Sequence, residues 1–194
     1  MTSATKSDPP LVIPVGDFGR AMSRQLIAEM PSATVVDHAT ACSADTSSPL
    51  VLATWREVPA LARSLDRLPR IPWWIPVVYD HPMIRVGPVL GRNLPGCYDC
   101  LAGRMLSAAE NPALKRDMWD MYDHDSALGI HGYLEHHAVI AASLTSALCR
   151  SAPEALREVQ VYDVLHGTLD RHTFVPLPNC ERWPKTSTMA GAVR

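Results

Sequence analysis

The chain has 194 residues, 47% of them hydrophobic and 20% charged, with a formal net charge of −2. This length can bury one complete core, so the composition predicts a single globular domain. The small net charge gives no basic field that would attract nucleic acid, so we exclude a nucleic-acid partner. No run approaches the roughly 18 apolar residues that a membrane helix needs, so we also exclude a membrane partner.

The first part of the chain alternates a short apolar run with an amphipathic segment. Residues 1–9 are predicted to be a disordered tail, and Leu11–Val15 is predicted to be a strand that ends in a glycine turn. From Arg20 to Met30, apolar residues recur at helical spacing, and a second strand is expected to end at Asp37. Strand, glycine turn, helix and strand in this order are typical of the opening of a doubly wound α/β domain.

The rest of the chain continues this alternation and ends in a hairpin. Three further strands are predicted, over residues 50–54, 73–80 and 83–90. Helices are predicted over residues 55–70, 101–125 and 134–152. A hairpin over 158–177 is expected to turn around His166 to Thr168. The sequence therefore predicts a Rossmann-like doubly wound sheet with a C-terminal helix and β-hairpin extension.

We expect one domain over residues 10–183 and a C-terminal tail over 184–194. Within the domain, residues 10–80 would form the Rossmann-like half. Residues 81–183 would carry a Cys-x-x-Cys segment, helices and the hairpin.

The turn after the first strand carries part of a nucleotide-binding signature. In the full signature, G-x-G-x-x-G, the glycines let backbone N–H groups approach a phosphate and let the helix pack close to the sheet. Here only Gly16 and Gly19 remain, and Asp17 would place a carboxylate beside the phosphate. Asp37 lies where a ribose-binding acid belongs. We interpret Gly16, Gly19 and Asp37 as a vestigial nucleotide site that has lost ATP binding.

Five cysteines at uneven spacing argue against a disulfide framework and favour a reducing, cytoplasmic location. Cys97 and Cys100 have the spacing of a zinc half-site, in which two thiolates on a tight turn reach one metal. Cys180 supplies a third thiolate, and the fourth ligand would be His172, His166 or another group. A redox-active pair and simple packing of small side chains remain as alternatives.

Four segments, taken in order, resemble one family of proteins. They are LVIPVGDFGRAMSRQL from Leu11, MIRVGPVLGRNLPGCYDCLAGR from Met83, HHAVIAASLTSAL from His136 and HTFVPLPNCERW from His172. Together they are similar to the ThiF-like (ubiquitin-activating-like) proteins of azole-containing peptide biosynthesis. The most specific element is the block R-V-G-P…P-G-C-x-x-C-L…R between Arg85 and Arg104.

The resemblance implies a role beside a YcaO-type partner. That partner activates a backbone amide with ATP, so that a Cys, Ser or Thr side chain cyclises into a thiazoline or oxazoline. The ThiF-like chain generally binds or presents the precursor's leader peptide and stimulates this cyclodehydratase. Many members carry a structural zinc held by two CxxC pairs. Cys97, Cys100 and Cys180 match three of those cysteines, and Trp183 stands in place of the fourth.

Two departures from the family shape the functional prediction. The resemblance implies that adenylating relatives carry an aspartate for magnesium after the third or fourth strand, and LVLATWRE has none. It also implies a winged-helix domain ahead of the first strand in leader-binding relatives, and we expect none here because the first predicted strand begins at Leu11. We therefore predict a non-catalytic ThiF-like subunit that supports a YcaO-type cyclodehydratase or its precursor peptide, and that can dimerise as relatives with this fold often do. The alternatives are a small adenylating enzyme or dehydrogenase of Rossmann type, supported by Gly16, Gly19 and Asp37, and a thiol–disulfide module.

Overall fold

A seven-stranded sheet runs through the centre of the molecule in the order β2-β1-β3-β4-β5-β6-β7. The structure is a computed structural model that describes residues 8–43, 48–151, 157–180 and 182. Trp183, the tail over 184–194 and most of the predicted N-terminal tail lie outside these residues. The strands are β1 (Leu11–Val15), β2 (Thr34–Val35), β3 (Leu50–Thr54), β4 (Trp74–Asp80), β5 (Met83–Val86), β6 (Glu158–Asp163) and β7 (Thr168–Thr173).

The sheet has a parallel half and an antiparallel half. Strands β1 to β4 are mutually parallel, whereas β5, β6 and β7 add to β4 in antiparallel fashion. The chain leaves β1 for β2 on one side and returns to β3 on the other side. The carboxyl ends of β1 and β3 therefore form a topological switch point, the place where open α/β sheets bind ligands.

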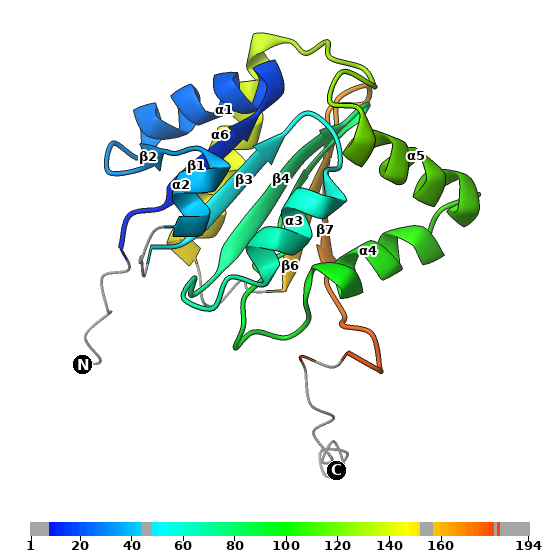
Figure 1. Cartoon of the computed structure of the whole chain (residues 1–194). Helices are drawn as coiled ribbons and strands as arrows, with labels where there is room; N and C mark the ends of the chain where they lie inside the picture. The colour runs from blue at the N-terminus through cyan, green and yellow to red at the C-terminus, as the bar shows by residue number, and fades with distance from the viewer. Residues whose placement is uncertain (1–7, 44–47, 152–156, 181, 183–194) are drawn as a thin grey trace, which may run out of the picture.

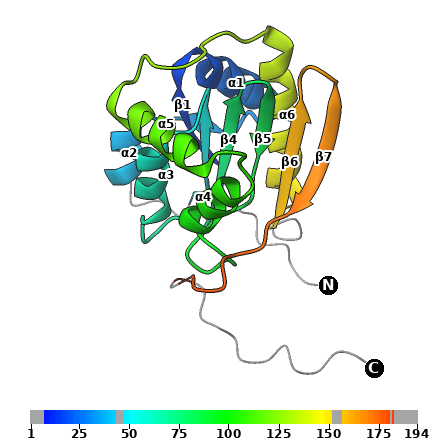
Figure 2. The ribbon, with the colours of Figure 1, turned by 90° about the vertical axis from the view of Figure 1, so that its right-hand side faces the viewer.

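Helices cover both faces of the sheet. They are α1 (Gly16–Glu29), α2 (His38–Ser43), α3 (Pro59–Asp66), α4 (Tyr98–Ser107), α5 (Pro112–His124) and α6 (Glu135–Ser151). Helices α1 and α6 pack together on one face, and α3, α4 and α5 lie on the other (Figures 1 and 2). This arrangement confirms the predicted α/β fold with its C-terminal helix and hairpin. None of the described helices is long and apolar enough to cross a membrane.

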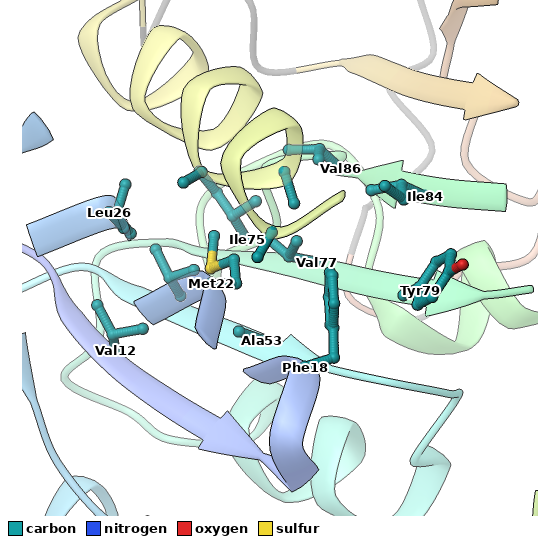
Figure 3. Close-up of a cluster of buried hydrophobic side chains, with 14 of the residues drawn as sticks. Val12, Phe18, Met22, Leu26, Ala53, Ile75, Val77, Tyr79, Ile84 and Val86 are labelled. Atoms are coloured by element: carbon teal, nitrogen blue, oxygen red, sulfur yellow. The ribbon is translucent and has the colours of Figure 1, made fainter. Parts of the chain in front are cut away.

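Two buried clusters hold these layers together, one on each face of the sheet. Val12, Met22 and Ile75 belong to the cluster under α1 and α6 (Figure 3). Ile13 and Trp74 belong to the cluster under α3 to α5. Because side chains alternate between faces along a strand, Val12 and Ile13 anchor opposite layers.

Several boundaries differ from the sequence prediction. Helix α1 begins at Gly16, directly after β1, and not at Arg20. The segment that we predicted as one helix over 101–125 is two helices, because it breaks before Pro112, and proline favours the first turn of a helix. Strand β5 ends at Val86, and beyond it only an isolated bridge to β4 remains.

Gly19 marks a point where α1 approaches the sheet too closely for a side chain. A Cβ at this position would lie 2.4 Å from the backbone oxygen of Ala53 in β3. We expect Gly19→Ala to lower the free energy of unfolding by about 2–3 kcal/mol, because a backbone atom cannot move aside cheaply. Urea denaturation measures this change.

Gly132→Ala is the matched control, because a Cβ there would meet nothing within 4 Å. We expect this variant to keep or slightly raise stability, since alanine restricts the unfolded chain. Equal losses in both variants would contradict the close approach of α1 to β3.

Candidate functional site

Three cysteines from distant parts of the chain come together beside the first turn of α4. Cys97 is the residue that precedes α4, Cys100 lies in its first turn, and Cys180 comes from the segment after β7. Their Sγ atoms all lie within 4.8 Å of one another. The structure thus brings together the three cysteines that the sequence analysis singled out.

The spacing of the sulfur atoms suits a tetrahedral zinc ion. The Sγ atom of Cys97 lies 3.7 Å from that of Cys100 and 3.7 Å from that of Cys180. Two thiolates that each lie about 2.3 Å from a tetrahedral zinc are separated by about 3.8 Å. The Sγ atoms of Cys100 and Cys180 lie within 4.8 Å of each other, so two of the three spacings match a zinc site and the third would shorten when a metal ion binds.

The fourth ligand does not come from the histidines that we named. In the part of the chain that the structure describes, the group of ligand atoms contains the three cysteines alone, so neither His172 nor His166 joins it. His166 instead pairs with Asp163 in the turn between β6 and β7. A cavity of about 410 Å³ opens beside the thiols, and Asp99 also lines it. The Asp99 carboxylate accepts a hydrogen bond from Arg63 at 2.9 Å.

A buried carboxylate positions α4 and its cysteines against the sheet. Asp66 accepts hydrogen bonds from the Trp74 indole and from the backbone N–H of Tyr98, each at 3.1 Å. The same carboxylate forms an ion pair with Arg182. Because the Tyr98 N–H is one of the unpaired donors at the start of α4, Asp66 caps that helix from outside it.

A second anchor fixes the segment that carries Cys180. Arg104 in α4 donates to the carbonyl oxygens of Val175 at 2.8 Å and Pro176 at 3.1 Å. Together with the Asp66–Arg182 pair, this contact holds the segment after β7 across the start of α4. Sequence reasoning did not assign these roles to Asp66 and Arg104, because contacts between residues so far apart in the chain leave no local pattern.

The thiols are less suited to redox chemistry than to metal binding. The Cys-x-x-Cys pair lies at the start of α4, a position that favours a thiolate. Burial has the opposite effect and raises the pKa of Cys97 to about 12. A reactive redox cysteine needs a lowered pKa, whereas zinc displaces the thiol proton when it binds.

The protein's own side chains fill the place where we predicted a vestigial nucleotide site. Trp55, at the carboxyl end of β3, is 4% exposed and lies against Gly16. A Cβ on Gly16 would lie 2.1 Å from Cδ1 of this indole, and one on Gly129 would lie 2.7 Å from its Cζ3. The His131 ring stacks on Trp55 with a centroid distance of 3.9 Å. The indole therefore occupies the space between β1 and β3 at the switch point.

Arg56 holds the connection between α5 and α6 over this point. Its Nη2 donates to the carbonyl oxygens of Tyr122 and Asp125, each at 2.9 Å. Its guanidinium also lies over the Trp55 ring at 4.8 Å and over the Tyr122 ring at 4.4 Å. Trp55 and Arg56 were missed by the sequence analysis, and their signal was the pair W-R directly after a buried strand at the switch point.

The three predicted nucleotide-site residues have structural roles. Gly16 has a φ of 71°, in the region that favours glycine, and makes the turn from β1 into α1. Gly19 allows the close packing of α1 on β3. The Asp37 carboxylate accepts a hydrogen bond from the Thr40 N–H at 2.6 Å. A hydrogen bond from the Thr40 side chain, together with the one from its backbone N–H, lowers the pKa of Asp37.

We expect the protein to hold close to one zinc ion per chain, measured by elemental analysis, and Cys97→Ser to lose it, because the three cysteines are already close together. Removal of zinc with a chelator should lower the free energy of unfolding by about 2 kcal/mol or more, because the metal binds the folded state.

Cys42→Ser is the matched control for this measurement. Cys42 is exposed, and its sulfur contacts His38 at 3.1 Å in α2, away from the cluster. We expect this variant to retain its zinc. A wild-type protein that contains no zinc, and whose stability a chelator leaves unchanged, would instead support simple packing of the thiols.

Solved structures share this fold, although no match is found at the level of the sequence. No family model and no curated protein match the sequence. A chain of the E. coli microcin synthetase McbBCD complex matches with a TM-score of 0.63 and 13% identity, covering 93% of this chain and 70% of that one.

Two further structures share the fold. The heterocyclase TruD matches with a TM-score of 0.60 and 15% identity over 91% of this chain, but this match spans only 27% of TruD. E. coli MccB matches with a TM-score of 0.56 and 12% identity, covering 97% of this chain and 68% of MccB. At these identities the comparisons establish the fold that the protein has in common with them.

Proposed function

We propose that the protein is a non-catalytic ThiF-like subunit that supports a YcaO-type cyclodehydratase during azoline formation on a ribosomal precursor peptide. The proposal is supported by a fold shared with a chain of the McbBCD complex, which has also been solved with pro-MccB17 bound, and with the heterocyclase TruD. The R-V-G-P…P-G-C-x-x-C-L…R block supports the same family.

The observation that carries the non-catalytic role is the position of Trp55. A nucleotide in an open α/β sheet places its phosphates over the first glycine turn, at the start of the first helix. Here that turn is Gly16, and the Trp55 indole packs against it under the His131 ring. Phosphates could reach the N–H groups of α1 only if Trp55 and the segment over it moved away.

The charge at the start of α1 also disfavours a triphosphate. Asp17 is exposed in the first turn and pairs with Arg20 one turn later, so the nearest cation is already engaged by a carboxylate. The alternative function, a small adenylating enzyme or dehydrogenase, would need both Trp55 and Asp17 to be displaced. We therefore favour a supporting role over ATP-dependent chemistry in this chain.

Helix α5 offers a surface for the partner cyclodehydratase. Leu114, Met118 and Met121 are spaced by four and three residues, so they form one stripe along α5, and all three are exposed. Trp119 in the same helix is buried in the core under α5 and does not belong to the stripe. A contiguous apolar stripe on a helix is typical of a protein–protein contact, and methionine adapts well to such surfaces.

We expect the purified protein to show no ATP–pyrophosphate exchange and to raise the turnover of its cyclodehydratase partner on a precursor peptide. Met118→Asp combined with Met121→Asp should weaken association with that partner at least tenfold by gel filtration or titration calorimetry, because two charges would be buried at the contact.

Val139→Asp provides the matched control, since Val139 is an exposed apolar residue on α6, on the opposite face of the sheet. It should leave the association unchanged. Strong exchange activity of the isolated chain would refute the non-catalytic role. Failure to bind or stimulate any YcaO-type partner encoded beside it would refute the supporting role.

A further inference from the structure

A second cavity lies on the opposite face of the sheet from the cysteines, beside the end of β4. Its volume is about 430 Å³, within the range of small-molecule pockets. Its walls come from the end of β4, the start of α6, the turn after β6 and the segment 130–134. At its mouth Ile130, Leu134 and Leu165 are 65%, 59% and 69% exposed, so the entrance is apolar.

Tyr79 lines this cavity, and its hydroxyl is unsatisfied and buried within the wall, so a ligand oxygen reaches it once a side chain of the wall moves aside. The residue is 2% exposed, and its ring packs 5.0 Å from Phe18 and 5.2 Å from His137, measured between centroids. Figure 3 shows its hydroxyl on the side away from Phe18. Among the described residues this oxygen has no hydrogen-bond partner. A buried hydroxyl without a partner is destabilising, so its presence points to a ligand that accepts from it.

His137 supplies a second donor in the same wall. Its Nδ1 accepts a hydrogen bond from the Leu134 N–H at 3.3 Å. In the neutral ring the proton is then on Nε2, which becomes a donor. Burial lowers the pKa of His137, and the nearby His136 and His81 lower it further, so the neutral form is favoured. Tyr79 and His137 thus both contribute donors beside the cavity, and the Tyr79 hydroxyl has no acceptor among the described residues.

The hydrogen-bond donors around the cavity favour an anion over a cation. Its lining includes His81, His136 and His137 but no carboxylate. Helix α6 starts at Glu135, and the start of a helix stabilises negative charge. Glu135 itself is exposed and does not line the cavity.

We propose that this cavity binds a small apolar monocarboxylate, whose carboxylate accepts hydrogen bonds from the Tyr79 hydroxyl and His137 and whose apolar body lies against Ile130, Leu134 and Leu165. An apolar body matches the walls, and an oxygen acceptor satisfies the buried hydroxyl. This inference is independent of the proposed role beside a cyclodehydratase, because it concerns the isolated chain.

The test is a titration of the full chain with octanoate, followed by amide NMR, with 1-octanol and octylammonium as probes of the same length. We expect saturable binding in the order octanoate, octanol, octylammonium, with shifts confined to the cavity. Tyr79→Phe should weaken octanoate binding about tenfold, which corresponds to one lost hydrogen bond to a charged group.

The melting temperature of Tyr79→Phe should stay the same or rise, because the variant removes an unsatisfied buried hydroxyl. This readout separates a binding role from a structural one. Tyr122→Phe removes a phenol from α5, on the other face of the sheet, and should change neither octanoate affinity nor fold. Equal binding of the three probes, no binding of octanoate, or full octanoate affinity in Tyr79→Phe would overturn the proposal.

Discussion

The contact between the Trp55 indole and Gly16 is the constraint on which the functional interpretation depends. An open α/β sheet leaves a crevice where its strand order reverses, and here that crevice lies between the ends of β1 and β3. Glycine at position 16 leaves room for the indole, and Gly129 leaves room on its other side. The same glycine that would approach a phosphate in a nucleotide-binding protein therefore accommodates a side chain of this one.

The segment over this crevice, between α5 and α6, also forms part of the cavity beside Tyr79. Arg56 fixes the connection after α5 through two backbone carbonyls, and His131 stacks on Trp55. Ile130 and Tyr133, on either side of His131, then line the apolar cavity beside Tyr79. A closed switch point and an open cavity on the neighbouring strand are thus two consequences of one ordered segment. The cysteine cluster lies apart from both and joins the segment after β7 to the start of α4.

Sequence patterns predicted the architecture well where the physical signal is local. Alternating apolar runs identified the strands, and the grouping of Cys97, Cys100 and Cys180 followed from thiol chemistry and a family resemblance. The prediction that His166 or His172 supplies a fourth metal ligand was wrong, because neither joins the three cysteines among the described residues. Where the hairpin places these histidines is not encoded in a local sequence pattern. The packing of Trp55 against Gly16 and the unsatisfied Tyr79 hydroxyl could not be found from sequence, since both are properties of the packed molecule.

The closed switch point can be tested by fluorine NMR of protein labelled with 5-fluorotryptophan. The chain has five tryptophans, and the signal of Trp55 can be assigned with Trp55→Phe. We predict that millimolar magnesium ATP leaves the Trp55 signal unchanged in position and width, because the indole stays packed against Gly16. A saturable shift of that signal on addition of ATP would show that the indole moves aside for a nucleotide, and it would contradict the assignment of a non-catalytic subunit.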